Sequence, residues 1–124
     1  MLGGVDYPRD LAVRMCETWM RGRRLVGFPR KHSHRLPLLD VLAQDFEPGR
    51  AYTAVEIDDA LREWNPDTAT LRRYLVDEGF LERFSDGSRW WRCGGTVDLD
   101  VAGLLADADR LHAERERRKR KTAG

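Results

Sequence analysis

Helix caps and helix breakers recur between residues 36 and 93, and their positions restrict the folds open to this region. Three segments there place apolar residues at three- and four-residue spacing, which is the period of a helix buried on one face. Pro48-Gly49 follows the first segment, a Thr53–Glu56 capping box opens the second, and Asn65-Pro66 follows it, with Asn65 as the expected cap of the third. We therefore predict helices at about residues 36–46, 53–64 and 67–78.

A β-hairpin is predicted directly after the third helix. Gly79 suits the left-handed position past a helix end, and the turn sequence Ser85-Asp86-Gly87-Ser88 separates two strand-like runs, residues 80–84 and 88–93. Three helices followed by a hairpin make a winged helix-turn-helix. We therefore expect a mainly α (α+β) protein with a winged helix-turn-helix core.

Two further helices are predicted outside this core, one near each terminus. Residues 6–21 and 101–111 each carry an apolar stripe at helical spacing, whereas the basic run at residues 115–121 lacks apolar residues and is expected to be frayed or disordered. We divide the chain into an N-terminal helix (1–22), a winged-helix domain (23–97), and a C-terminal helix with its basic tail (98–124), together one compact unit. The two stripes either cover the core or pair across a two-fold axis, and we favour the second, which predicts a homodimer.

Several runs of residues in the middle of the chain carry a family resemblance. They are Arg30 to His32, Leu38 to Ala43, Phe46 to Arg50, Tyr52-Thr53, Val55 to Asp58, Asp67, Thr70 to Val76, Gly79 to Leu81, Arg83 and Trp91-Arg92. Together they resemble the DUF2087 family of bacterial proteins, over roughly residues 23–92. The resemblance implies a role in transcription, because members of that family occur alone or attached to helix-turn-helix regulators. It implies no activity that can be transferred residue by residue.

Charge is distributed unevenly along the chain. Residues 1–35 carry a net charge of +5, residues 36–109 of −9, and residues 110–124 again of +5. DNA affinity depends largely on Lys and Arg side chains that neutralise phosphates. The predicted core is therefore too acidic to bind DNA alone, so the basic ends, including residues 115–121, would have to hold the backbone. In an equally open interpretation, the basic ends pair with an acidic surface, their own or a partner's.

The third predicted helix is the candidate DNA-reading element, because in a DNA-binding winged helix this helix enters the major groove. The hairpin adds Arg83, Arg89 and Arg92 near the adjacent backbone. The residues that we expect to contact nucleic acid are Arg30, Lys31, Arg35, Thr68, Thr70, Arg72, Arg73 and Arg89. In the alternative interpretation, Arg72 and Arg73 only solvate the helix face and pair with nearby acids.

Trp90 is the candidate partner-binding residue. With a two-residue Asp86-Gly87 turn, Phe80, Phe84, Trp91 and Cys93 share the hairpin face that we assign to the core, which leaves Trp90 between arginines on the outer face. There it would stack on a cation or anchor a partner. This supports a second hypothesis, a protein–protein adaptor that docks on the transcription or translation machinery through Trp90 and the acidic second helix.

The sequence offers no motif for catalysis or for a cofactor. Gly-rich phosphate loops, GxSxG and HExxH are absent, and His32 and His34 lack the spacing of a zinc site, so we expect neither an enzyme nor a metal protein. Cys16 and Cys93 are far apart and are expected to be reduced thiols. No apolar run approaches the roughly 18 residues of a membrane span, and no signal peptide is visible, so a cytoplasmic location is expected.

Overall fold

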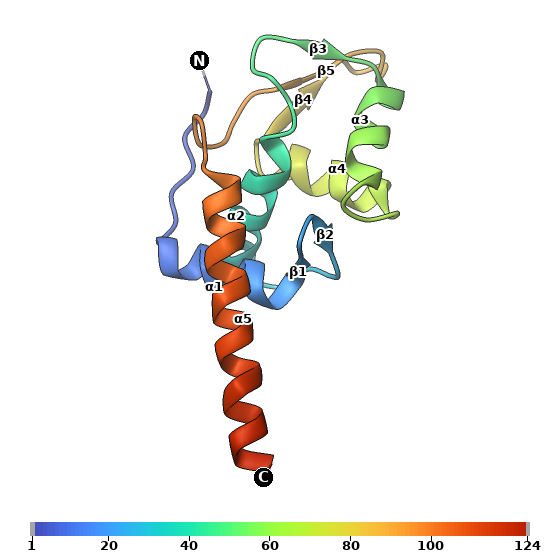
Figure 1. Cartoon of the computed structure of the whole chain (residues 1–124). Coiled ribbons are helices and arrows are strands. Elements are labelled where there is room, and N and C mark those ends of the chain that lie inside the picture. The colour runs from blue at the N-terminus through green and yellow to red at the C-terminus, as the bar shows by residue number, and fades with distance from the viewer. Residues whose placement is uncertain (1, 124) are drawn as a thin grey trace.

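The computed structural model describes residues 2–123, so Met1 and Gly124 of the two predicted terminal segments lie outside the described residues. Its helices are α1 (Arg9–Trp19), α2 (His32–Ala43), α3 (Ala54–Arg62), α4 (Thr68–Asp77) and α5 (Val101–Ala123). Strands β1 (Met20–Arg21) and β2 (Arg24–Leu25) form one antiparallel sheet, and β3 (Ala51–Tyr52), β4 (Leu81–Arg83) and β5 (Trp90–Arg92) form a second in the order β3-β5-β4. The protein is mainly α with small antiparallel sheets, as predicted (Figure 1).

The start of α3 confirms the predicted capping box. Thr53 Oγ1 accepts a hydrogen bond from the Glu56 backbone at 3.2 Å, and the Glu56 carboxylate accepts one from the Thr53 backbone at 2.9 Å. The predicted cap of α4 is wrong by two residues, because Asp67 and not Asn65 accepts the hydrogen bond from the Thr70 backbone. Asn65 instead accepts one from the Asp67 backbone at 2.8 Å, in the turn that precedes the helix.

Helix α2 begins earlier than predicted and lies at the centre of the core. It starts at His32, so the basic stretch around Arg35 belongs to its first turns. Residues 37–43 are all buried, and α2 packs against α1 and α4. Helix α1 also packs against α5. One hydrophobic cluster joins α2 to the other helices and to the sheet, with Phe46, Trp64 and Phe80 among its largest fully buried side chains.

The apolar stripes of the terminal helices are buried within the chain. Leu11, Ala12, Met15 and Cys16 of α1 and Leu104 and Ala108 of α5 belong to the core. The sequence left open whether these stripes cover the core or pair two copies of the chain. They cover the core, so they no longer give a reason to expect a homodimer.

Among residues 2–123, no helix combines the length and the apolar character that crossing a membrane requires.

The basic tail is helical, so the prediction that it is frayed or disordered is wrong. Helix α5 continues to Ala123, and its last turns project away from the rest of the protein (Figure 1). Arg, Lys, Glu and Ala are good helix formers, which explains why the helix continues without apolar contacts. Lys119 Nζ also lies 3.6 Å from Glu116 Oε1, one turn away.

The hairpin has the predicted register, and Phe80 is buried as predicted, but strands β4 and β5 present the opposite face to the core. Arg83 pairs with Trp90 and Leu81 with Arg92, as a two-residue turn requires. Leu81, Trp90 and Arg92 are buried, however, whereas Phe84 is 54% exposed. The prediction that Trp90 and Arg92 lie on the outer face is therefore wrong.

Arg92 is tolerated on the core face because its guanidinium is satisfied by backbone carbonyls. It donates to Gly94 O at 2.9 Å, to Thr96 O at 2.8 Å and to Phe46 O at 3.3 Å. Burial lowers the pKa of Arg92, and the nearby Asp40 carboxylate opposes that shift. A charged residue at this position thus joins the sheet to the loop that leads into α5.

Candidate nucleic-acid interface

An open groove of about 490 Å³ lies between α4 and the β4–β5 hairpin. Arg72 and Arg73 line it from α4, Arg83 lines it from β4, and the indole of Trp90 lies between them. The guanidinium carbons of Arg72 and Arg83 lie 5.8 and 5.5 Å from the centroid of the Trp90 ring. The groove therefore combines three cationic side chains and one acidic side chain, Asp77, with an aromatic surface.

The outward face of α4 follows from its helical period. Leu71 and Leu75 are buried in the core, which turns Ala69, Arg73 and Val76 toward the groove. Small or apolar side chains at two of these positions leave the Arg73 side chain unobstructed. Arg73 is exposed, and its guanidinium carbon lies 5.7 Å from the Tyr74 ring.

Arg72 is held by an acid of the preceding helix. Its Nε lies 3.0 Å from Asp58 Oδ1, and both side chains are less than a third exposed. These two atoms are buried and have no well-aligned hydrogen bond within the described residues, so each is the other's electrostatic partner. For Arg72, the alternative interpretation of a pair with a nearby acid is the observed arrangement, and the pair ties α3 to α4.

Three of the acids on α3 lie close to arginines. Glu56 Oε2 is 3.6 Å from Arg50, Asp59 Oδ1 is 2.8 Å from Arg62, and Asp58 pairs with Arg72 as described above. These contacts reduce the negative potential that the sequence suggested for this helix. The net charge of −9 over residues 36–109 already counts these three arginines, so the core remains acidic in the folded protein.

Arg35 joins the start of α2 to the end of α4. Its guanidinium donates to Pro29 O at 2.9 Å and to Arg30 O at 3.0 Å, and its carbon lies 4.4 Å from the Tyr74 ring. Arg35 is thus a structural residue that shapes the loop before α2.

The same loop presents Arg30 and Lys31, which are exposed at the N-terminus of α2. A helix N-terminus flanked by exposed cations favours bound anions.

Of the other residues predicted to bind nucleic acid or a partner, only Trp90 lines the groove. Arg89 is exposed beside the hairpin turn, where its guanidinium donates to Ser88 O at 2.8 Å. Thr68 and Thr70 are partly buried at the sides of α4 and do not line the groove. Trp90 is only 6% exposed and lies against the groove as part of its wall, not as a free anchor.

Ala69 and Val76 are groove residues that the sequence analysis missed. They lie at the i−4 and i+3 positions relative to Arg73, so the helical period contained the signal. Neither side chain is charged or carries a hydroxyl group, so the chemistry of these residues alone gives no sign of a binding surface.

Comparison with known proteins places the chain in a family. No curated protein and no solved structure matches it significantly. A family model described as "Uncharacterized protein conserved in bacteria (DUF2087)" matches residues 24–92, which is more than half of the chain and contains the groove between α4 and the hairpin. Helices α1 and α5 lie outside the matched segment. The protein therefore belongs to the DUF2087 family of uncharacterised bacterial proteins.

Proposed function

We propose that this protein binds duplex DNA as a winged helix-turn-helix regulator or accessory factor, with α4 in the major groove and the β4–β5 hairpin as the wing. The observation that carries the proposal is the placement of Arg73 and Arg83 on two elements that line one open groove. An α-helix fits the major groove of B-DNA, and an exposed arginine on it can bond both acceptors of a guanine.

The proposed roles differ between the arginines. Arg73 reads base edges, because it is exposed on the outward face of α4. Arg83 and Arg89 contact phosphates from the hairpin, and Arg30 and Lys31 contact them from the N-terminus of α2. Arg72 keeps α4 in position through Asp58 and does not read bases itself.

Salt-dependent binding tests this function. Anisotropy of a labelled random-sequence duplex is measured between 50 and 200 mM salt for the parent and for the Arg73→Ala/Arg83→Ala double variant. Each lost phosphate contact makes the negative slope of log K against log salt less steep by about 0.9, and the affinity for the random-sequence duplex falls with it. Arg62→Ala is the control, because Arg62 is exposed on α3, pairs with Asp59 and does not line the groove.

Two outcomes contradict the proposal. The first is a parent protein that binds duplex DNA with no dependence on salt, or does not bind it. The second is a double variant that binds as tightly, and with the same slope, as the parent and the Arg62→Ala control.

A second candidate function is the protein–protein adaptor, and one observation favours it. Phe84 is 54% exposed on the outer face of the hairpin, where it packs edge-to-face against Trp91 with ring centroids 5.3 Å apart. Exposed aromatic pairs are common anchors of protein interfaces. Phe84 and Trp91 would thus replace Trp90 as the contact. Phe84→Ala should leave DNA binding intact under the first function and abolish partner binding under the second.

A further inference from the structure

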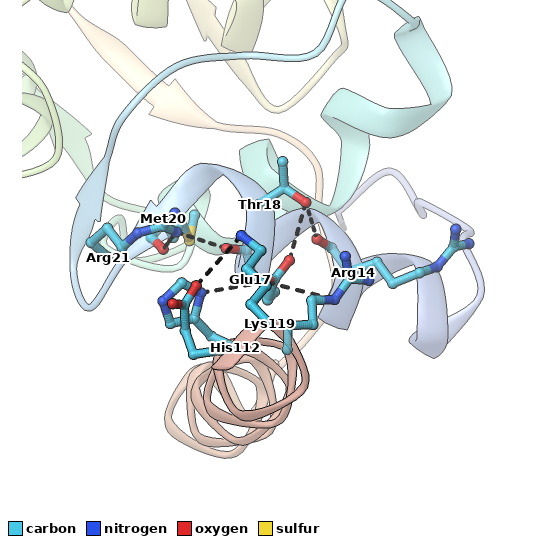
Figure 2. Close-up of polar contacts among 9 residues, drawn as sticks. Arg14, Glu17, Thr18, Met20, Arg21, His112 and Lys119 are labelled. Carbon is cyan, nitrogen blue, oxygen red and sulfur yellow. Dashed lines mark hydrogen bonds and ion pairs between the residues drawn. The ribbon is translucent and has the colours of Figure 1, made fainter. Parts of the chain in front are cut away.

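A second opening, of about 470 Å³, lies where α1 meets α5, on elements that the α4 groove does not use. Arg21 lines it from β1, and Arg115, Arg118 and Lys119 line it from α5. Figure 2 shows this region, with the α5 side chains facing the end of α1. Four permanently basic side chains thus surround one cleft, against the two carboxylates of Glu17 and Glu116.

Glu17 lies inside the cleft but leaves little negative charge at its mouth. Its side chain is 8% exposed, its Oε1 lies 3.4 Å from His112 Nδ1 and 3.7 Å from Arg115 Nε, and Thr18 Oγ1 donates to its Oε2 at 3.3 Å (Figure 2). The Glu17 carboxylate therefore contacts His112 and Arg115, which lie about one turn apart on the same face of α5. This fixes the rotation of α5 at the point where the helix leaves the body of the protein.

Beyond this point α5 has no packing that would explain its length. Ala108 is its last residue in the hydrophobic core. Of residues 113–122, all but Glu116 are exposed, and they carry six basic and two acidic side chains. At 1.5 Å per residue, this projecting half of α5 is about 15 Å long. A basic helix of this length, fixed at its base, is a preformed surface for a row of phosphates.

The β1–β2 ladder places Arg21 of the cleft opposite a second arginine. Arg21 and Arg24 are directly opposite each other in the two-stranded ladder, and both are exposed. Like charges at directly opposed positions destabilise a ladder. The Arg21 guanidinium is held at the cleft, because it donates to Glu17 O at 2.7 Å and to Met20 O at 2.8 Å.

From these observations we infer that the α1–α5 cleft and the projecting half of α5 form a second binding surface for the phosphate backbone of duplex DNA. This inference rests on the proposed function, that the protein binds duplex DNA. Arg21, Arg118 and Lys119 contact phosphates at the cleft, and the other basic residues of α5 follow the backbone outward. Glu17 keeps the helix pointing in the direction that this contact requires.

The double variant Arg118→Gln/Lys119→Gln tests this surface in the full-length chain. Glutamine retains the helix propensity of the two residues and removes their charge. If both contact phosphates, the slope of log K against log salt becomes less negative by about 1.8, and the parent loses roughly tenfold more affinity than the variant between 50 and 200 mM salt. The charge-matched control is Arg14→Gln/Arg62→Gln, because Arg14 lies near Asp10 on α1, Arg62 lies on α3, and neither lines the cleft.

The outcomes separate this inference from the proposed function. Loss of affinity and slope in Arg118→Gln/Lys119→Gln but not in the control supports the second surface. If this variant and the control change equally, or if neither changes, while Arg73→Ala/Arg83→Ala binds weakly, the second surface is refuted and the α4 groove stands. If only Arg118→Gln/Lys119→Gln loses binding, the α4 groove is refuted and the second surface stands.

Discussion

The carboxylate of Asp40 accepts two hydrogen bonds from Thr96, from its backbone N–H at 2.8 Å and from its hydroxyl at 2.6 Å. Asp40 is fully buried in α2, and Thr96 lies in the loop that leads from β5 to α5. The Tyr7 hydroxyl donates to the same carboxylate at 2.6 Å, and the Gln44 side chain donates to it at 3.2 Å. One buried acid thus holds the segment before α1 and the segment before α5 against the central helix.

Asp40→Ala is expected to lower the free energy of unfolding by about 3–5 kcal/mol, because it leaves several buried donors without an acceptor. Tyr7→Phe removes a single donor and should lower it by only about 1–2 kcal/mol. Urea denaturation followed by circular dichroism measures both values. A smaller loss for Asp40→Ala than for Tyr7→Phe would contradict a central role for the carboxylate.

The Arg72–Asp58 pair should couple α3 and α4 energetically. A double-mutant cycle with Arg72→Ala and Asp58→Ala is expected to give a coupling energy of about 1–3 kcal/mol, because the facing atoms are buried. The exposed Arg62–Asp59 pair, with side chains 57% and 66% exposed, is the matched comparison and should give less than about 1 kcal/mol. Equal coupling energies in the two cycles would show that burial adds nothing to the Arg72–Asp58 pair.

Local signals predicted the order of the elements well. The Thr53–Glu56 capping box and the Asp86-Gly87 turn involve only neighbouring residues, and both have the predicted geometry. The prediction for the tail beyond Leu111 was wrong because an apolar stripe is not needed for a helix there, and intrinsic propensity sustains α5 to Ala123. The short strands β1, β2 and β3 were missed, since two residues cannot display an alternating pattern.

Contacts between distant segments explain what the sequence did not predict in the candidate site. Trp90 and Arg92 face the core because the Arg92 guanidinium reaches the carbonyl of Phe46, which is 46 residues away. Arg72 is held by Asp58, an acid on a different helix. Neither partner can be read from spacing along the chain, so the sequence placed Arg72 and Arg73 on one helix but did not show that Arg72 is held by an ion pair.

Acid should weaken the cap of α3. The backbone N–H of Thr53 holds the pKa of the exposed Glu56 carboxyl below its ordinary value of 4.5. A lowered pKa means that the contribution to stability is present above that value and is lost as the pH falls through the lower folded-state pKa. The free energy of unfolding of Glu56→Gln should therefore depend less on pH than that of the parent below about pH 4.5. Titration of both proteins by urea denaturation at several pH values checks this, and parallel curves would contradict it.

The two thiols should differ in reactivity while the protein is folded. Both cysteines are free, and burial raises the pKa of Cys16 from 9.0 to about 12, whereas Cys93 is partly exposed and its pKa is raised less far. The thiolate is the reactive form, so at pH 8 iodoacetamide should modify Cys93 slowly and leave Cys16 unmodified.

In denaturant both thiols should react, which controls for access to the reagent, and peptide mass spectrometry measures each site.

The raised pKa of Cys16 should also make the free energy of unfolding depend on pH in alkaline solution. The folded state keeps Cys16 protonated where the unfolded chain ionises, so the stabilising contribution is complete below pH 9 and declines as the pH rises from 9.0 toward about 12. Cys16→Ala should remove this decline, apart from the loss that its cavity causes at every pH. Rapid native modification of Cys16 at pH 8 would show that α1 opens away from α2 and α5 far more readily than its packing indicates.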